Sequence, residues 1–312
     1  MKNALELRGV SKRYGDFTAV RDLSLDIPAG SIYGFLGPNG AGKTTTIRMV
    51  LDIIQPSSGS ITVLGAPSAL QVRERIGYLP EEKGLYKKMK AWAIIAYFAS
   101  LKGMNRREAK RRAFELLERY GLKDFASART EALSKGMGQK VQVLASIAHD
   151  PDFVILDEPF SGLDPVNQQV MEEVIQDLNR RGSTIIFSTH VMAHAERICD
   201  RILLIAKGSK VFDGTLEEAR RLVPRKVRIR TADDVAGLRG LPGVQSLQPV
   251  EQADGSREVW DVYLDEQGSA EEVLQFCFEH RIRLLAFDRS EPSLHDVFVH
   301  LVGPEAREAS LR

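Results

Sequence analysis

Residues 37–44, which read Gly-Pro-Asn-Gly-Ala-Gly-Lys-Thr, constrain the fold of this chain more than any other segment. An apolar run at residues 31–36 precedes them, and Ile47, Val50 and Leu51 follow at helical spacing. A strand, a glycine-rich turn and a helix in this order direct backbone N–H groups and the positive helix end at bound phosphates. The segment therefore predicts a phosphate-binding loop within an α/β domain.

The residue types in this loop indicate what each one contributes. Lys43 is expected to reach the β- and γ-phosphates of a nucleotide, and the Thr44 hydroxyl to coordinate Mg²⁺. Gly37, Gly40 and Gly42 permit positive φ angles and a close backbone approach, which a Cβ atom would hinder. The expected nucleotide contacts here are Gly37, Pro38, Asn39, Gly40, Ala41, Gly42, Lys43, Thr44 and Thr45.

Polar residues end two further apolar runs. Asp157 and Glu158 end the run at residues 152–157, and His190 follows the run at residues 183–188. Ligands of open parallel sheets bind at the carboxyl ends of the strands, so these side chains are expected at one crevice. There Asp157 would hold Mg²⁺, Glu158 would polarise an attacking water, and His190 would bond the γ-phosphate. The other histidines have no such setting and are interpreted as structural or exposed.

Residues 133–139, Leu-Ser-Lys-Gly-Met-Gly-Gln, lie between two helical patterns. The Ser134 hydroxyl and the Gly136 N–H at a helix start would form a second anion site. Taken alone, an ordinary helix N-cap is the simpler interpretation.

Composition limits the remaining possibilities. The chain has 312 residues, enough for one large domain and a smaller one. Its 43 Lys and Arg residues nearly balance its 42 Asp and Glu residues, so no nucleic-acid partner is expected. Cys199 and Cys277 stand far apart in apolar surroundings, which predicts buried thiols in a reducing compartment. The longest apolar stretch, residues 91–101, is about half of the ~20 residues that a membrane helix needs, so we expect a soluble chain.

Hydrophobic periodicity predicts an α/β core interrupted by helices. The first thirty residues alternate in polarity, which predicts antiparallel strands, and residues 86–148 show helical spacing. We expect a nucleotide-binding domain over residues 1–223, with a helical subdomain at about 82–150. The side chains at core spacing in this helical part are Ile94, Ile95, Phe98, Phe114, Leu117 and Tyr120.

After Pro224 the pattern changes to that of a separate accessory domain over residues 224–312. Its expected order of strand, helix, strand, strand, helix, strand is ferredoxin-like, with a turn at Asp254-Gly255 between the central strands. A last amphipathic helix follows at residues 294–301. The expected strands are 226–230, 244–250, 258–264 and 282–287, and the expected helices are 233–238 and 269–280.

Taken in order, these segments resemble the nucleotide-binding subunit of ATP-binding cassette (ABC) transporters over residues 3–222. Residues 77–86, 133–137 and 291–298 are most similar to sodium-export-like and related ABC-2 type efflux ATPases. The matching elements are Tyr14 as the adenine-stacking aromatic, residues 37–44 as Walker A, residues 77–81 (Gly-Tyr-Leu-Pro-Glu) as the Q-loop, residues 133–139 as the signature, residues 153–158 as Walker B, residues 161–164 (Ser-Gly-Leu-Asp) as the D-loop and His190 as the switch histidine.

The resemblance implies an α/β fold: a P-loop ABC-type core with an antiparallel β subdomain and a helical subdomain, plus a small α+β ferredoxin-like domain. It implies an ATPase that uses ATP and Mg²⁺, in which this chain pairs with a second copy or a paralogous subunit. Each ATP would lie between Walker A of one subunit and Ser134 and Gly136 of the other, and Asp164 would couple the two sites. The catalytic residues would be Lys43, Glu158 and His190, and the metal ligands Thr44, Glu81 and Asp157.

Two positions depart from the family pattern. Position 81 is Glu where most of the superfamily has Gln; a carboxylate also coordinates Mg²⁺, so the change alters charge near the γ-phosphate and keeps a ligand. The signature carries Lys135 and Met137 where Gly and Gln are usual, while Ser134 and Gly136 are retained. Lys135 either adds an electrostatic contact or faces solvent.

The resemblance also implies partners. Transport would require a separate integral-membrane permease, so the expected location is peripheral, on the cytoplasmic face of the membrane. The expected docking surface is residues 81–101, where Tyr86, Met89, Trp92 and Phe98 are large and apolar; the alternative is that half or more of them pack the helical subdomain.

Three other classes share part of this pattern. Soluble ABC ATPases that act on nucleic acid or ribosomes usually have two cassettes, coiled coils or basic arms. A non-hydrolysing ATP-dependent dimerisation module is disfavoured by Lys43, Asp157, Glu158 and His190. Another P-loop enzyme, such as a kinase, has no use for the signature and D-loop. The transporter ATPase is the favoured interpretation, with efflux fitting better than uptake.

Overall fold

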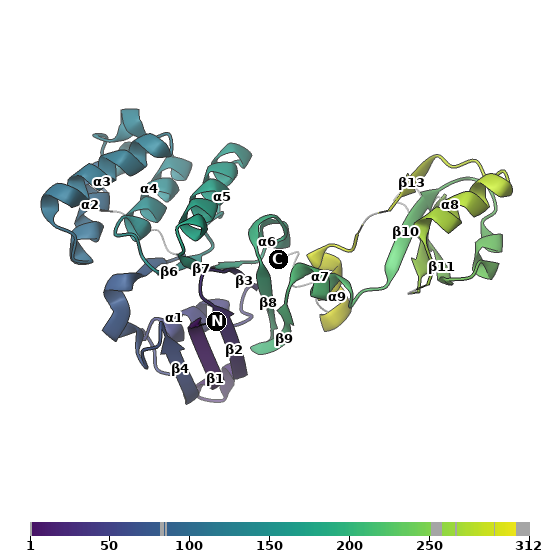
Figure 1. Ribbon diagram of the computed structural model, residues 1–312, viewed down its shortest axis with the longest axis horizontal. Helices are drawn as coiled ribbons and strands as arrows, with labels where there is room; N and C mark the ends of the chain where they lie inside the picture. The colour runs from purple at the N-terminus through teal and green to yellow at the C-terminus, as the bar shows by residue number, and fades with distance from the viewer. Residues whose placement is uncertain are drawn as a thin grey trace. The chain divides into compact units, whose positions relative to one another are not determined.

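The computed structural model of the protein describes residues 2–81, 84, 86–250, 258–265, 267–289 and 291–303. Within these residues the chain divides into two compact units (Figure 1). Unit 1 extends to Leu216, and unit 2 begins at Glu217. The boundary expected near residue 223 lies a few residues further along, directly before the first strand of unit 2.

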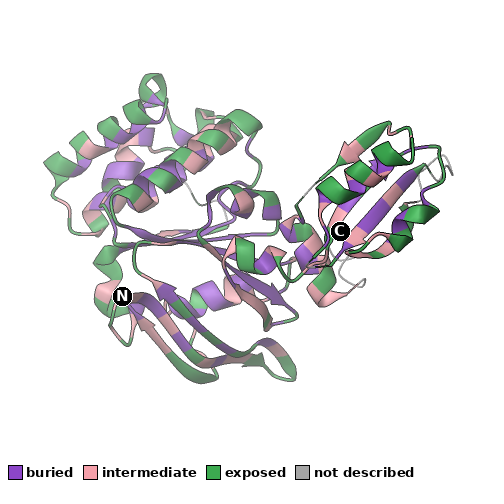
Figure 2. Ribbon diagram, turned by 45° about the vertical axis from the view of Figure 1, so that its right-hand side comes forward, coloured by how far each residue is buried: buried purple, intermediate pink, exposed green. Residues whose placement is uncertain are grey.

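A six-stranded sheet forms the centre of unit 1. In spatial order its strands are β5 (Ile76–Leu79), β6 (Phe153–Asp157), β7 (Thr184–Thr189), β3 (Ile32–Leu36), β8 (Arg201–Ala206) and β9 (Ser209–Gly214). Pairing is parallel from β5 to β8, and only β9 runs antiparallel to its neighbour. Strands β3, β6 and β7 are buried at every residue, as expected for parallel strands covered on both faces (Figure 2).

A three-stranded antiparallel sheet lies on one side of this central sheet. Its strands, in order, are β2 (Phe17–Pro28), β1 (Asn3–Tyr14) and β4 (Ser58–Val63). Helix α1 (Lys43–Val50) lies between the two sheets, because Ile47 and Val50 share one buried cluster with Leu7 of β1 and Phe35 of β3. The antiparallel β subdomain and the strand–loop–helix unit expected from the sequence are therefore present.

Helices cover the opposite side of the central sheet, with α2 to α5 away from β1 and β2 (Figure 1). Three of them begin at Asn105, Ser134 and Asp164, whose side chains accept hydrogen bonds from N–H groups of the first turn. Among the described residues, none of the helices has the length and apolarity that a bilayer crossing demands. The helices are α2 (Ala91–Leu101), α3 (Arg106–Arg119), α4 (Lys135–Ile147), α5 (Pro165–Arg180) and α6 (Met192–Ile198), and the 3-10 helices are η1 (Ala69–Arg75), η2 (Lys123–Phe125) and η3 (Thr130–Ala132).

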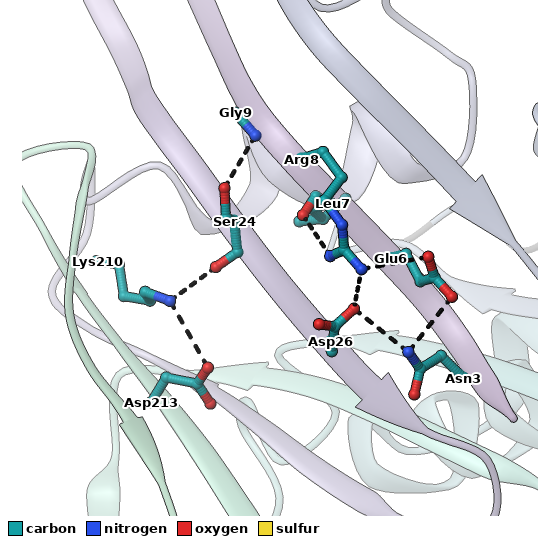
Figure 3. Close-up of polar contacts among 9 residues, drawn as sticks. All are labelled: Asn3, Glu6, Leu7, Arg8, Gly9, Ser24, Asp26, Lys210 and Asp213. Atoms are coloured by element: carbon teal, nitrogen blue, oxygen red, sulfur yellow. Dashed lines mark hydrogen bonds and ion pairs between the residues drawn. The ribbon is translucent and has the colours of Figure 1, made fainter. Parts of the chain in front are cut away.

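Polar contacts at the surface of unit 1 join β9 to β2 across the two sheets, and β1 to β2 within the antiparallel sheet (Figure 3). Lys210 of β9 donates to the Ser24 carbonyl of β2 at 2.7 Å and pairs with Asp213 at 3.7 Å. Arg8 of β1 pairs with Asp26 of β2 at 2.7 Å. Exposed pairs of this kind contribute about 0–1 kcal/mol each, so they fix register more than they stabilise the fold.

Unit 2 is a four-stranded antiparallel sheet with its own core. The strands are, in order, β11 (Val244–Val250), β12 (Val259–Leu264), β10 (Arg225–Arg230) and β13 (Ala286–Asp288), and the helices are α7 (Leu216–Arg220), which spans the division, η4 (Ala236–Gly240), α8 (Ala270–Glu279) and α9 (Leu294–Val302). This order is that of a split βαβ, or ferredoxin-like, sheet. Its buried centre contains Ile229, Val262, Val273 and Cys277.

Two elements of unit 2 differ from the sequence-based expectation. The helix expected at residues 233–238 is a 3-10 helix at Ala236–Gly240, since Gly237 and Gly240 weaken α-helix formation. The strand expected at 282–287 is only Ala286–Asp288, because the backbone before it bonds to side chains: Arg283 N–H donates to Asp233 at 2.6 Å. The turn expected at Asp254-Gly255 lies outside the described residues.

One aromatic expected in the core lies at the surface. Phe114 is exposed on α3 and stacks on Trp92 of α2, with ring centroids 5.8 Å apart. Leu117, one turn further along the helix, packs inward and is fully buried, so Phe114 lies at the edge of the buried face. Helical spacing identified the buried face of α3 correctly, but it included one residue, Phe114, that the structure leaves exposed.

Both cysteines are buried and unpaired, as expected. A Cβ added at Gly34 would lie 2.8 Å from Cys199 Sγ, so this thiol packs directly on β3. Burial raises the pKa of both Cys199 and Cys277, which keeps them protonated and unreactive.

The separate core of unit 2 generates a prediction about stability. Ile229→Ala should lower the free energy of unfolding of unit 2 by about 2–4 kcal/mol, because Ile229 is fully buried and a cavity would remain. Differential scanning calorimetry would show the transition of unit 2 shifted downward. The control is Phe278→Ala on α8, where the side chain is 75% exposed and a change within about 0.5 kcal/mol is expected. Equal effects of the two substitutions would contradict the packing described.

Candidate functional site

The phosphate-binding loop is held between backbone segments on two sides. A Cβ added at Gly42 would lie 2.6 Å from a carbonyl oxygen of β2, and Gly42 has a φ of +106°, so both space and conformation require glycine. On the other side, a Cβ at Gly37 would overlap the carbonyl oxygen of Ile205 in β8. The Gly208 N–H, in the β8–β9 turn, donates to the Ala41 carbonyl at 3.0 Å. The shape of the loop is therefore built by the fold itself.

Lys43 is the first residue of α1 and is buried beneath the loop. Its Nζ donates to two loop carbonyl oxygens, at 2.6 and 3.2 Å. Burial lowers the pKa of Lys43, and the carboxylates of Glu158, Asp157 and Glu81 oppose this by favouring the cation. The structure thus groups one ammonium with three carboxylates from two other segments, the end of β6 and the residues after β5.

Asp157 ends β6 and is almost fully buried. The Ser188 hydroxyl of β7 donates to Asp157 Oδ1, whereas the buried Oδ2 has no hydrogen-bond partner among the described residues. Burial raises the pKa of Asp157, and the hydroxyls of Ser188 and Thr44 nearby act against that rise. A buried carboxylate oxygen without a partner, beside Thr44, fits a ligand of a divalent cation.

Glu158 and His190 contact each other just beyond the ends of β6 and β7. His190 Nδ1 lies 2.9 Å from Glu158 Oε1, and the carboxyl side is buried while the imidazole is half exposed. Glu158 has a φ of +51°, uncommon for a residue with a side chain, and its N–H donates to the Ser188 carbonyl at 3.2 Å. Residues with side chains that adopt this left-handed backbone conformation are concentrated at functional sites, where the surrounding structure enforces the conformation.

Ser134 and Gly136 belong to a second cluster, formed by the starts of α4 and α5. Ser134 is the N-cap of α4 and accepts from the Met137 N–H at 3.2 Å. Asp164 is the N-cap of α5 and accepts from Asn167, from its N–H at 2.9 Å and from its side-chain amide at 2.6 Å; these bonds lower the pKa of Asp164. A Cβ at Gly136 would lie 3.1 Å from Asn167 Nδ2, so the two helix starts are in contact.

Tyr14 and Glu81 are the remaining expected nucleotide contacts. Tyr14 ends β1 with its side chain 52% exposed, and Lys12 Nζ lies 5.2 Å from the centre of its ring. An exposed aromatic ring of this kind suits stacking on a base. Glu81 is exposed two residues after β5, and its charge reaches Lys43.

The structure brings the expected site residues together at two places on unit 1. One gathers Lys43, Thr44, Glu81, Asp157, Glu158 and His190, and the other gathers Ser134, Gly136 and Asp164. Sequence reasoning missed Ser188 and Asn167. A hydroxyl within an apolar strand was the only signal for Ser188, and the position three residues after Asp164 was the only signal for Asn167.

A buried histidine supports the backbone behind Glu158. The His194 ring lies 4.2 Å from that of Phe160, which meets Phe187 of β7 edge to face at 5.7 Å. His194 Nδ1 is buried without a partner among the described residues. Burial, followed by nearby positive charges, lowers the pKa of His194 to about 4. The ring is therefore neutral near pH 7 and acts as a packing group, as the sequence suggested.

Comparison with known proteins connects this geometry to a family. The family model described as "ABC transporter" matches residues 20–161, and the model described as "ATP-binding protein DrrA1-3-like, C-terminal domain" matches residues 214–302. The chain is similar to the uncharacterized ABC transporter ATP-binding protein YhaQ of Bacillus subtilis (strain 168), with 41% identity over 96% of this chain and 98% of that protein.

A second relative and a solved structure are also similar to this chain. The linearmycin resistance ATP-binding protein LnrL of Bacillus subtilis (strain 168) is 31% identical over 97% of this chain and all of that protein. A solved structure described as the ATP binding subunit of an ABC transporter superposes with a TM-score of 0.65 at 32% identity, covering 70% of this chain and 92% of that one.

The neutral state of His194 generates a pH prediction. An unfolded His titrates near pH 6.5, so the unfolded chain binds more protons between about pH 4 and 6.5, and stability falls as pH falls through this window. His194→Phe keeps a ring against Phe160 without the titration. Urea unfolding at pH 7.5 and pH 5 should show that this variant loses about 1–2 kcal/mol less stability than the wild-type chain. An identical pH dependence of stability in the variant and the wild-type chain would show that the His194 ring is not held neutral by burial.

Proposed function

The chain belongs to the ATP-binding subunits of ABC transporters, and we propose that it powers export of a small molecule through a separate membrane permease. As a member of this family it binds ATP and is an ATPase. Export is supported by the similarity to LnrL, a resistance protein, along nearly the whole chain. The match of residues 214–302 to an appended C-terminal domain supports an accessory role for unit 2.

The contact between Glu158 and His190 beside Lys43 is the observation that best supports ATP hydrolysis by this site. Glu158 would accept a proton from the attacking water, since its carboxylate is buried and held by His190 Nδ1. His190, oriented by the contact of its Nδ1 with Glu158, would present Nε2 to the γ-phosphate. Lys43 would leave the loop carbonyls and neutralise the charge that develops on the phosphate oxygens.

Mg²⁺ fits the unpartnered oxygen of Asp157. Thr44 and Asp157 would hold the ion, with Glu81 as a further oxygen ligand. This donor set fits Mg²⁺, which proteins bind through one or two carboxylates together with substrate phosphates and water. When bound, the ion supplies positive charge to the β- and γ-phosphates.

A second subunit would complete the site. The loop at residues 37–44 is fixed by β2, β8 and the β8–β9 turn, whereas Ser134 and Gly136 are fixed by α4 and α5. The Ser134 turn would therefore bind a phosphate presented by a second copy or a paralogous subunit. A γ-phosphate that both subunits bind would favour the closed pair, and hydrolysis would release it.

An apolar groove beside the Q-loop would receive the permease at the cytoplasmic face of the membrane. The groove has a volume of about 240 Å³ and is lined by Tyr78, Leu79, Pro80, Gly84, Phe98, Gln142, Ala145 and Ser146. Of the four aromatic and apolar residues expected at the docking surface, Tyr86 is 55% exposed and Met89, Trp92 and Phe98 are half-buried. Packing of the subdomain thus uses part of this set and leaves part accessible.

A substitution that fills the groove tests whether the permease docks there. Ser146→Trp should remove the stimulation of ATPase activity by the cognate membrane permease, because the indole would occupy the space the permease enters. The measurement is phosphate release with and without that protein in lipid nanodiscs, together with co-purification of the pair. Full stimulation of Ser146→Trp would contradict docking at this groove.

Removing the base tests hydrolysis. Glu158→Gln should bind ATP, form a stable pair and lose about 100-fold or more in turnover, because an amide cannot accept the proton of the water. Phosphate release and sedimentation of the Mg²⁺–ATP complex would measure both effects. The matched control is Glu173→Gln, an exposed position on α5. Wild-type turnover in Glu158→Gln would exclude the role assigned to this carboxylate.

A further inference from the structure

Lys135, which lies between the two expected phosphate contacts of the signature, covers the D-loop of its own chain. A Cβ added at Gly162 would lie 2.6 Å from both Cε and Nζ of Lys135 and 3.4 Å from its Cδ. Gly162 has no side chain, so the lysine stem packs on bare backbone at a residue whose φ is +69°. Lys135 is exposed, which agrees with the second of its two expectations, solvation, and the end of its stem also lies along the backbone of residue 162.

Further contacts join the same two segments. Gly136 packs on Asn167, whose amide bonds the Asp164 carboxylate at 2.6 Å. One turn further along α4, the Gln139 amide donates to the Pro159 carbonyl at 3.4 Å. The first turns of α4 therefore contact the connection between β6 and α5 at Pro159 and Gly162, and the first turn of α5 at Asn167.

We propose that Lys135 is a positioning residue that ties the signature to the D-loop within one chain, so that both segments enter and leave the subunit interface as one body. This inference rests on the proposed two-subunit mechanism. The connection at residues 159–164 begins directly after Glu158. A phosphate bound at Ser134 would in this way also place the backbone next to the catalytic carboxylate of the same chain.

The side chain at position 135 decides whether this tie exists. Glycine, the usual residue of the family at this position, has no atoms that reach residue 162. The physical basis is packing of the end of the stem, because residue 162 offers only backbone atoms to Cδ and Cε of the lysine. An ammonium that acts on a phosphate of the partner subunit would require the charge instead, so substitutions that separate stem from charge distinguish the two.

The test is a series of substitutions in the full-length chain. Lys135→Ala removes the stem, Lys135→Met keeps the stem without the charge, and Gly162→Ala pushes against the stem from the other side. Arg106→Ala is the matched control, because Arg106 is an exposed cation at the first position of α3, next to its N-cap. Each variant is measured for kcat and KM of Mg²⁺–ATP hydrolysis, for ATP binding at low protein concentration, and for ATP-driven pairing in a Glu158→Gln background.

Lys135→Ala should lower kcat by about threefold or more and weaken pairing, with ATP binding to the single subunit unchanged, while Lys135→Met retains activity. Gly162→Ala should be more damaging in the wild-type chain than in Lys135→Ala, since the clash disappears with the stem. The inference is overturned if Lys135→Ala behaves like Arg106→Ala, if the two substitutions add independently, or if Lys135→Arg retains activity and Lys135→Met does not. Failure of the Glu158→Gln chain itself to pair would instead overturn the two-subunit mechanism.

Discussion

The site depends on the close approach of three backbone segments that meet without intervening side chains. The loop before α1, strand β2 and the β8–β9 turn converge where Gly42 and Gly208 both face the carbonyl oxygen of Ala19, so that a Cβ on either would lie 2.6 or 2.7 Å from it. This contact holds the central sheet, the antiparallel sheet and the loop in one arrangement. A loop with its shape built in needs little reordering when phosphates bind, which favours both affinity and a fixed reaction geometry.

The same packing explains the charges buried beside the loop. Lys43 and Asp157 are both removed from water. Burial lowers the pKa of Lys43 and raises the pKa of Asp157, which favours the neutral form of each side chain. Isolated buried charges are strongly destabilising, but here each offsets part of the cost of the other, and Ser188 supplies a hydrogen bond to the carboxylate. The arrangement keeps opposite charges available for a phosphate and a metal, at some expense of stability.

Much of this could be predicted from the sequence, for reasons that differ between residues. The loop glycines, Lys43 and Asp157 were identifiable because their chemistry is set by local order along the chain: a strand, then a turn or a terminal acid. The ferredoxin-like order of unit 2 followed from alternating polarity, and its topology agrees. Local pattern also placed Ser134 at a helix start, which the N-cap hydrogen bond bears out.

Contacts between distant segments could not be read from local pattern. Ser188 meets Asp157 only because β6 and β7 are neighbours, and Asn167 meets Gly136 only because two helices begin at the same place. The 3-10 helix of unit 2 and its short last strand differ from expectation because side-chain hydrogen bonds and glycines outweighed hydrophobic spacing there. The left-handed backbone of Glu158 had no counterpart in the sequence, since nothing in its residue type requires it.

The two shielded thiols have a practical consequence for spectroscopy of this chain. Cys199 and Cys277 are protonated, enclosed and out of reach of maleimides, so the natural background is silent to thiol-directed probes. A fluorophore or spin label attached to a single introduced cysteine on an outer helix would therefore report from one place only. Distances between labelled subunits could then be measured in solution without first replacing Cys199, whose sulfur atom packs against β3.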